Sequence, residues 1–405
     1  MAIIEETQLR ATLLAVDEIN QAGGVNGREL APLIYDPQSD AQAYGQYAKR
    51  LMIDDGVTMI FGCYTSSSRK AVLPVVERLN GLLWYPTLYE GFEFSPNVIY
   101  TGAAPNQNSV ALCSYLAETY GKRFYLVGSD YVYPRESNRV MRDLLRARGC
   151  TVVGEKYLDL RAKRGEFRPV MQQIKNAGAD VIFSTVVGDS TVYLYQAFAE
   201  AGLDARIVPI GSLTTTESEV RAMGFDVAAG HVTAAPYFQS VRGDRNDSFV
   251  KRYKKRYGAD EPTNMCAEAA YFQVHLFAKA LALTESMETD LIKQSVLGVD
   301  FEAPQGRVCI NAATSHTDLW SRVGRVDRRG QFEIVQQSAT SVWADPFLIG
   351  RGNLAAAPAT FPRSTLLSPF LPTSTATCWR GSCREPAAAC AASGRCRTVF
   401  PLPPM

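Results

Sequence analysis

Short hydroxyl side chains and tyrosines follow the ends of several predicted strands, and these residues are the candidates for chemistry. After "VTMIFG" (57–62) the chain continues "CYTSSSRK", and after "LLWY" (82–85) it continues "PTLYEG". The same arrangement returns in "VGSDYVYPRES" and in "FSTVVGDS". Hydroxyl groups donate and accept hydrogen bonds without a charge, and tyrosine rings add flat apolar walls. Such a set suits a small uncharged polar molecule, for example a primary amide or urea.

In an open parallel sheet, ligands bind beyond the carboxyl ends of the strands. The alternative is that the tyrosines pack in the core and the serines only cap helices. The repetition at four strand ends favours a ligand site. The predicted ligand-binding residues are Tyr64, Ser66, Tyr85, Thr87, Tyr131, Tyr133, Thr185 and Val186.

Catalytic chemistry has little support in this sequence. The three histidines, His231, His275 and His316, are far apart, and the sequence has no HExxH, GxSxG or GxxxxGK[ST] motif. Cys63 follows a strand and could be a nucleophile activated by a helix N-terminus, but burial would keep it a protonated thiol. We predict no catalytic residue, no metal site and no cofactor, and an enzyme acting on amides is the weakest hypothesis.

Apolar strands alternate with helical stripes along most of the chain. "LAPLIYD" (30–36) and the two strands named above form a first series, and "RFYLVG" (123–128) begins a second one. Strands that are apolar on both faces, each followed by a helix, indicate a parallel sheet covered on two sides. Because the series runs twice, we predict an α/β fold with two doubly wound lobes.

Later elements are expected to complete both lobes. Long helices follow residue 247, and "DRRGQ" within 306–336 predicts a hairpin. The expected division is lobe one from residues 1–118 with about 240–300, and lobe two from residues 119–239 with about 301–350.

The bulk composition gives no sign of a nucleic-acid or membrane partner. The formal net charge is +1, and no stretch approaches 18 consecutive apolar residues. "KRYKKRYG" could contact phosphates, but at helical spacing it more simply forms a solvated charged face. The N-terminus lacks the basic and apolar regions of a secretory signal, which favours a cytoplasmic location.

The last segment, residues 351–405, differs from the rest of the chain. It is crowded with Ala, Pro, Ser, Thr, Cys and Arg and has one acidic residue, Glu385. Such a composition cannot bury a core, so we expect a disordered or aberrant tail. Its four cysteines lack convincing metal spacing, and the five earlier ones indicate small buried side chains in a reducing compartment.

Long motifs in this sequence resemble those of a known family. They include "GCYTSSSRKAVLPVVE", "YPTLYEGFEFSPNVIYTGAAPNQNS", "GSDYVYPRESNRVMRDL", "FSTVVGDS", "SLTTTESEV" and "APQGRV", within about residues 8 to 348. They are similar to the amide- and urea-binding branch of the type I periplasmic-binding-protein family. That branch includes the amide-sensing negative regulator of aliphatic amidase expression and the urea- and amide-binding proteins of ABC transporters.

The resemblance implies a two-lobed fold with three crossovers and a ligand in the cleft. It implies that Tyr64, Ser66, Tyr85, Thr87, Tyr131 and Tyr133 match the amide pocket. The regulator branch is the one that we favour, and there the resemblance implies an RNA-binding antiterminator partner that amide binding releases. In the transporter branch, the alternative, the protein is periplasmic and delivers urea or amide to an ABC permease.

One departure from the family concerns its first strand. The family opens with an apolar strand, whereas this chain begins at the first helix. The missing element would pair on both sides in the centre of a sheet, so its absence would leave two rows of backbone groups unpaired. We therefore predict that this chain is unstable or aggregates when it is expressed from this start, and that the true start lies upstream.

Overall fold

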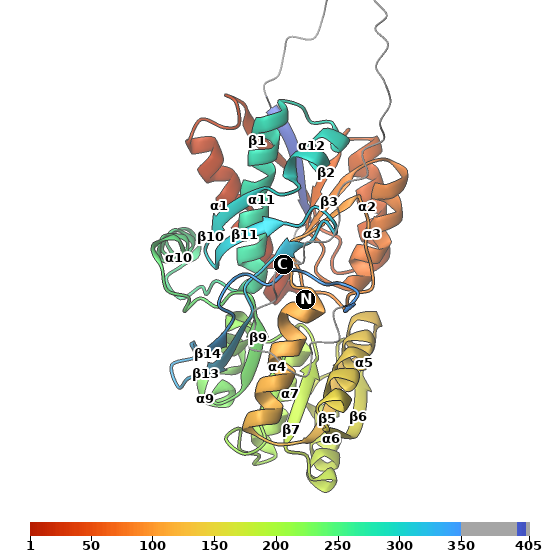
Figure 1. Cartoon of the computed structure of the whole chain (residues 1–405), viewed down its shortest axis with the longest axis vertical. Coiled ribbons are helices and arrows are strands. Elements are labelled where there is room, and N and C mark those ends of the chain that lie inside the picture. Colours follow the sequence, from red (N-terminus) through yellow and green to blue (C-terminus); the bar gives the residue numbers. More distant parts are fainter. Residues whose placement is uncertain (350–394, 402–405) are drawn as a thin grey trace, which may run out of the picture.

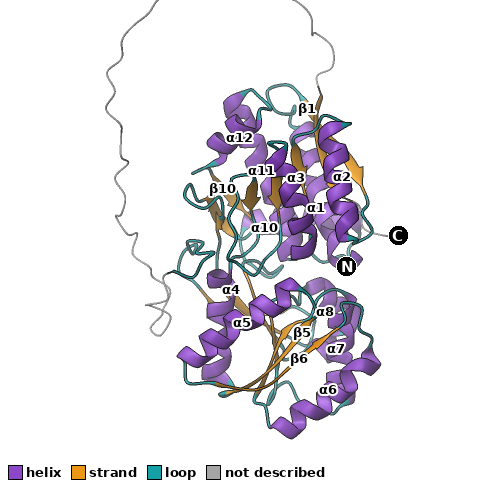
Figure 2. Ribbon diagram, turned by 90° about the vertical axis from the view of Figure 1, so that its right-hand side faces the viewer, coloured by secondary structure: helices purple, strands orange, loops and turns teal. Residues whose placement is uncertain are grey.

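The computed structural model describes residues 1–349 and the backbone of residues 395–401. The chain forms two lobes, one above the other in Figure 1, and in each lobe helices cover a β-sheet (Figure 2). This arrangement confirms the predicted α/β fold with two doubly wound lobes.

Lobe one is built from three separate stretches of the chain. Its first elements are α1 (Ala2–Gln21), β1 (Glu29–Tyr35), α2 (Ala41–Ile53), β2 (Met59–Phe61), α3 (Ser66–Arg78), β3 (Leu82–Tyr85) and β4 (Val98–Tyr100). Its later elements are α10 (Asp244–Tyr257), α11 (Met265–Thr284), α12 (Thr289–Val296), β10 (Asp300–Ala303), β11 (Gly306–Ile310) and β12 (Thr317–Asp318). The last of its elements is β15 (Arg395–Pro401).

The main sheet of lobe one has five parallel strands in the order β1-β15-β2-β3-β4. Successive residues of a strand point to opposite faces. Leu83 of β3 accordingly packs on the side of α2 and α3, whereas Trp84 packs on the side of α1 and α11. The ring of Trp84 lies 5.4 Å from Phe61 and 6.0 Å from Phe277 of α11. Burial on both faces explains why these strands are continuous apolar runs.

Strand β15 occupies the central position that we expected to be vacant. It pairs with β1 over seven residues, from Glu29↔Arg395 to Tyr35↔Pro401, and with β2 through Val399↔Ile60. The backbone groups on the facing edges of β1 and β2 therefore have a strand between them. The expectation of an empty central position is wrong for this structure. The expectation of a tail without structure is also wrong for residues 395–401, and the rest of 351–405 lies outside the described residues.

Lobe two contains the second α/β series and the predicted hairpin. Its elements are α4 (Pro105–Thr119), β5 (Arg123–Ser129), α5 (Val132–Ala147), β6 (Thr151–Leu158), α6 (Arg164–Ala177), β7 (Val181–Thr185), α7 (Asp189–Glu200), β8 (Ile210–Ser212), α8 (Glu217–Met223), α9 (Phe225–Ala228), β9 (Val232–Ala235), β13 (Arg322–Val326) and β14 (Phe332–Gln337). The sheet order is β14-β13-β9-β8-β7-β5-β6, with β13 antiparallel to both of its neighbours. The antiparallel β13–β14 pair confirms the hairpin around "DRRGQ".

The chain passes between the lobes after β4, after β9, after β12 and again between β14 and β15, and two of these crossings differ from the expected boundaries. Helix α4 packs against β9 and β13 of lobe two, so the first crossing comes before residue 105 rather than at 118. Residues 300–318 stay with lobe one, because β10 packs on α11 and His316 bridges to Tyr100 of β4. The return to lobe two therefore comes after residue 318 rather than at 301.

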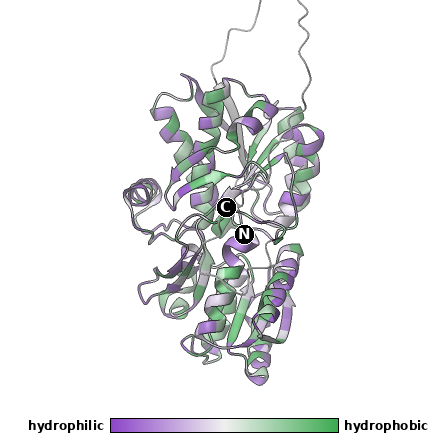
Figure 3. Ribbon diagram, in the orientation of Figure 1, coloured by the Kyte–Doolittle hydropathy of each residue, from purple (hydrophilic) through white to green (hydrophobic). Residues whose placement is uncertain are grey.

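The hydrophobic core is continuous across the two lobes. Apolar residues line both sheets and the inner helix faces, whereas the outer faces are hydrophilic (Figure 3). One buried cluster contains residues of both sheets and of the helices between them. Among the helices of the described residues, none is both long and apolar enough to cross a bilayer.

Candidate ligand-binding site

The turn after β2 directs a tyrosine toward lobe two. Gly62 and Cys63 have φ values of +136° and +67°, so the chain turns sharply where the strand ends. A left-handed conformation is uncommon for a residue with a side chain and often accompanies a functional turn. Thr65 then caps α3, accepting a hydrogen bond from the Ser68 N–H at 3.1 Å. The helix therefore begins at Ser66, and Tyr64 precedes it.

Two of the predicted hydroxyls in lobe one support this turn. The Tyr85 hydroxyl donates to the carbonyl of Tyr64 at 3.1 Å. The Thr87 hydroxyl donates to the carbonyl of Cys63 at 3.3 Å and accepts from the Gln8 amide at 2.8 Å. Their protons are therefore used within lobe one, and these residues hold the loop that presents Tyr64.

In lobe two, the tyrosines and the strand-end threonine differ in how their hydroxyls are paired. Tyr131 precedes α5 and Tyr133 lies in its first turn, with their ring centroids 6.2 Å apart. The buried Tyr133 hydroxyl makes no hydrogen bond of good geometry, although the Ser137 side chain lies close enough to counter part of the rise that burial causes in its pKa. Thr185, in contrast, donates to the Asn138 side chain at 2.9 Å, and the Val186 carbonyl accepts from two neighbouring threonines. Of these four residues, the two tyrosines are the better placed to meet a ligand.

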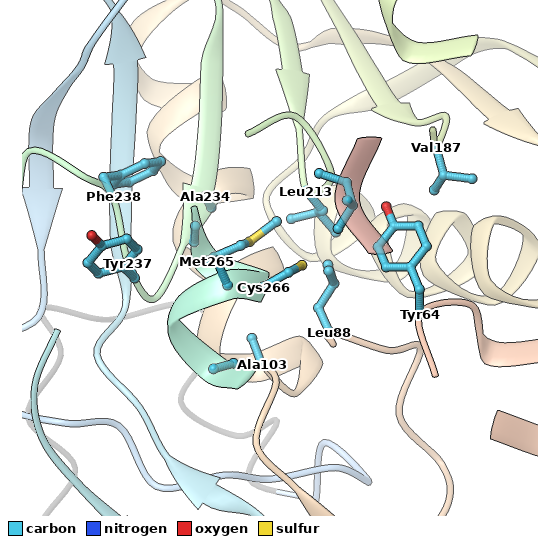
Figure 4. Close-up of a cluster of buried hydrophobic side chains, with 14 of the residues drawn as sticks. Tyr64, Leu88, Ala103, Val187, Leu213, Ala234, Tyr237, Phe238, Met265 and Cys266 are labelled. Carbon is cyan, nitrogen blue, oxygen red and sulfur yellow. The ribbon is translucent and has the colours of Figure 1, made fainter. Parts of the chain in front are cut away.

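The two lobes meet around Tyr64. Figure 4 shows Tyr64 reaching toward Leu213 and Val187 of lobe two, with Cys266 of α11 in the middle of the cluster. The pKa of Tyr64 is raised well above its usual value, first by burial and then by the nearby Glu219, Cys266, Tyr131 and Tyr133. The structure therefore brings together Tyr64, Tyr131 and Tyr133, which are far apart in the sequence. Whether they contact a ligand stays a prediction.

Glu219 is a residue of this junction that the sequence reasoning did not mark. It is fully buried, and one of its carboxyl oxygens accepts from the Thr216 N–H at 2.9 Å and from the Thr216 hydroxyl at 2.5 Å. The other oxygen, Oε1, has no partner. Burial raises the pKa of Glu219 to about 7, and Asp189 adds to this effect against the hydrogen bonds from Thr216. The signal in the sequence was the T-x-x-E spacing of a capping box at residues 216–219.

A buried ion-pair cluster beside Ser66 was also missed. Arg69 is fully buried and pairs with Glu90 at 3.0 Å and with Glu93 at 2.7 Å. Its guanidinium lies 5.0 Å from the ring centroid of Tyr85 and 4.8 Å from that of Tyr89. Burial opposes the charge of Arg69, but the neighbouring Tyr85, Glu90 and Glu93 outweigh it and raise its pKa. The cluster is neutralised internally, so it offers no free cation to an anionic ligand.

Nucleophilic chemistry is disfavoured by the surroundings of Cys63. Burial raises the pKa of its thiol to about 12, so the thiolate is absent at neutral pH. A hollow of about 1390 Å³ lies elsewhere, between residues 240–246, residues 302–306 and β14. It is open and lined by charged and polar side chains such as Arg242, Asp244 and Arg329, away from the strand ends. We therefore place the candidate site at the junction of the lobes.

Comparisons with known proteins agree with this architecture. A family model described as "Periplasmic binding protein domain" matches residues 1–351. The Leu/Ile/Val-binding protein homolog 6 of Brucella suis is 25% identical over 288 residues, covering 69% of this chain and 73% of the relative. The leucine-, isoleucine-, valine-, threonine- and alanine-binding protein of Pseudomonas aeruginosa is 23% identical, covering 75% of this chain and 80% of the relative.

Solved structures share the fold. A solute-binding protein of an ABC transporter from Rhodopseudomonas palustris HaA2, in complex with p-hydroxybenzoic acid, aligns with a TM-score of 0.79 and 21% identity over 86% of this chain and 96% of that one. LivJ from Streptococcus pneumoniae, in complex with isoleucine, aligns with a TM-score of 0.71 and 18% identity over 83% and 94% of the two chains. Since the family model spans most of the chain and both lobes, the chain belongs to the periplasmic binding protein family.

Proposed function

We propose that this chain is the solute-binding component of an ABC transporter for a small neutral polar molecule, a short-chain amide or urea. The observation that carries the proposal is a pair of unpartnered polar atoms near Tyr64, the Tyr133 hydroxyl and Glu219 Oε1. A buried polar group without a partner costs about 1–3 kcal/mol. Both groups belong to lobe two and are buried beside lobe-one residues such as Tyr64 and Glu90. A ligand that pairs with them removes this cost from the closed state, in which water does not reach them, so it favours that state.

The chemistry of the two atoms favours an amide or urea. Glu219 Oε1 as a carboxylate can only accept, whereas the Tyr133 hydroxyl can donate or accept. An amide has N–H groups that can donate to Glu219 Oε1 and a carbonyl that can accept from the Tyr133 hydroxyl. A carboxylate ligand would need a cation, and the buried Arg69 beside the site is already paired with Glu90 and Glu93.

The comparisons change the order of our two functional hypotheses. Relatives with amino-acid-binding names and neighbours from ABC transporters support the transporter hypothesis over the amide-sensing regulator with its antiterminator partner. An ABC permease is then the partner, and the periplasm the location, in place of the cytoplasm. The amide or urea specificity rests on the site, because the named ligands of these relatives are amino acids and aromatic acids.

Isothermal titration with acetamide, urea, leucine and 4-hydroxybenzoate tests the proposal. Acetamide and urea each have four heavy atoms, so a ceiling of roughly 1.5 kcal/mol per atom allows a Kd of about tens of micromolar. We expect acetamide or urea to bind in that range, and leucine and 4-hydroxybenzoate to give no heat. Binding of either acid with both amides silent would overturn the proposed ligand class. Neighbouring genes for a permease and an ATPase would support the transporter, and an amidase with an antiterminator would support the regulator.

A further inference from the structure

The hydroxyl proton of Ser66 has a fixed direction in this structure. Ser66 is 1% exposed, and its hydroxyl donates to Glu90 Oε2 at 2.5 Å. Arg69 Nη1 donates to the same hydroxyl oxygen at 3.2 Å. A serine hydroxyl has one proton and two acceptor positions. The proton and one acceptor position are therefore used, and what Ser66 has left is one lone pair.

The partners of Ser66 cannot exchange these roles. An ionised carboxylate only accepts and a guanidinium only donates, so the Ser66 proton must point to Glu90. The other oxygen of Glu90 accepts from Arg69 Nη2 at 3.0 Å, which fixes the carboxylate in turn. Arg69 Nε donates to Glu93 on the other side of the guanidinium. Burial alone would raise the pKa of Glu93, but Arg69 and Lys70 lower it to about 2. Glu93 therefore keeps its negative charge at ordinary pH and holds Arg69 in place.

The same cluster lies against lobe two. Burial is the largest cause of the raised pKa values of Tyr131 and Tyr133. The charge of Glu90 raises both values further, and the charge of Arg69 lowers that of Tyr131. Helix α3, which begins at Ser66, packs against α5, which carries Tyr133. Ser66 thus lies at the edge of the lobe junction, beside Tyr64.

We propose that Glu90, held by Arg69, orients the Ser66 hydroxyl as a hydrogen-bond acceptor, and that lobe one thereby selects ligands with N–H groups and rejects carboxylates. This inference rests on the proposed function, because Ser66 must meet the ligand. Glu90 is a positioning residue, since it acts through Ser66. An amide N–H meets the free lone pair of Ser66, whereas a carboxylate oxygen brings a second lone pair to the same place and is repelled.

Acetamide and acetate test the inference because they have nearly the same shape, but acetamide carries an –NH₂ group where acetate carries an –O⁻. Titrations at pH 8 give the ratio of their Kd values for the wild type, Glu90→Gln and Glu93→Gln. In Glu90→Gln the new amide can donate to Ser66 and turn its proton outward. We expect acetamide affinity to fall about tenfold and the acetate-to-acetamide ratio to shrink by a similar factor or more.

Glu93→Gln is the matched control. It removes one carboxylate partner of Arg69, as Glu90→Gln does, but Glu93 makes no hydrogen bond to Ser66. We expect it to lower the melting temperature while leaving the ratio unchanged. Equal changes of the ratio in both variants would show a general charge effect and overturn the inference.

Ser66→Ala provides an independent readout if Glu90→Gln does not fold. It should lower acetamide affinity and reduce the ratio with Glu90 and Arg69 intact, and Glu90→Gln added to it should cause no further change in the ratio. Wild-type affinity and ratio in Ser66→Ala would overturn the role of Ser66. If the wild type binds neither acetamide nor urea, the proposed function itself fails, whereas amide binding with an unaltered ratio in Glu90→Gln refutes only this inference.

Discussion

The guanidinium of Arg139, in α5 of lobe two, lies 4.9 Å from the ring centroid of Phe92, in lobe one. Phe92 is 39% exposed and has a left-handed φ of +58°, which is uncommon for an aromatic residue. Its N–H donates to the carbonyl of Pro346 at 2.8 Å, which helps to hold this conformation. The strained loop therefore presents an aromatic face to the opposite lobe, next to Glu90 and Glu93.

Arg139→Gln should accelerate ligand release. A cation–π contact at an exposed site contributes about 0.5–1 kcal/mol. This contact joins the two lobes, so removing it should destabilise the closed state and weaken ligand affinity about two- to fivefold. Stopped-flow fluorescence would measure the dissociation rate. Arg146→Gln, at the other end of the same helix, is the control and should leave the rate unchanged. An unaltered rate in Arg139→Gln would contradict a role of this contact in closure.

Acetamide affinity should depend on pH through Glu219. Its pKa is raised to about 7, first by burial, so below that pH the carboxyl is protonated and accepts an N–H poorly. Affinity should therefore be constant above pH 8 and decrease as the pH falls through 7, and Glu219→Gln should bind weakly with a flat profile. Titrations from pH 5.5 to 9 provide the measurement.

The other ionisable groups around Glu219 determine the control for this profile. Asp189, Tyr64, Tyr195 and Cys266 interact with it, and Glu217 has a pKa raised by burial to about 8. Glu217→Gln should therefore keep the decrease near pH 7. A wild-type affinity that is equal at pH 6 and pH 8 would exclude a ligand contact with Glu219 Oε1.

Local sequence patterns predicted the fold better than the site. Alternation of apolar strands and helices predicted both sheets, because a strand buried on two faces has a strong signature of its own. The start of α3 at Ser66 is set by the Thr65 cap, which depends on one side chain rather than on periodicity. The same kind of argument could have marked Glu219, because the T-x-x-E spacing at residues 216–219 is that of a capping box.

The buried charges could not be predicted from local sequence. Arg69 lies in the first turns of α3, and its partners Glu90 and Glu93 lie on a loop after the next strand. Only the fold brings them within 3.0 Å. The lobe boundaries were shifted for a similar reason, since the side on which α4 packs depends on contacts with β9 and β13.

Lowering the pH from 7 to 5 should destabilise the protein partly through His231. This residue is 1% exposed, its Nδ1 accepts from the Ile210 N–H at 2.9 Å, and burial lowers its pKa to about 3. Because the folded pKa lies below the unfolded value of about 6.5, this stabilisation is complete above pH 6.5 and is lost as the pH falls toward 3. At pH 5 the loss is about 2 kcal/mol.

His231→Asn keeps a hydrogen-bond acceptor and removes the titration. The free energy of unfolding of this variant, measured in urea at both pH values, should fall by about 2 kcal/mol less than that of the wild type. The comparison with the wild type is needed because Glu217, Glu219 and Glu268 have raised pKa values and act in the opposite direction over this range. Identical pH dependence in the two proteins would contradict the buried neutral state of His231.

Strand β15 should be required for the stability of lobe one. It separates β1 from β2 in the sheet, so its removal leaves two facing rows of backbone groups without partners. Deletion of residues 351–405 should lower the melting temperature by more than about 10 °C or cause aggregation, whereas deletion of residues 402–405 should not. Thr398→Pro tests the pairing in the full chain, because proline removes a backbone donor and is poorly tolerated in a central strand.

The loss of β15 should also weaken ligand binding at the candidate site. Strand β2 pairs with β15 on one side, and its end carries the turn that positions Tyr64 and Ser66. Thr398→Pro should therefore weaken acetamide binding as well as stability, although residue 398 is far in sequence from every candidate ligand contact. Equal melting temperatures and equal acetamide affinities for the full chain and the 351–405 deletion would mean that lobe one holds β1 and β2 together without β15.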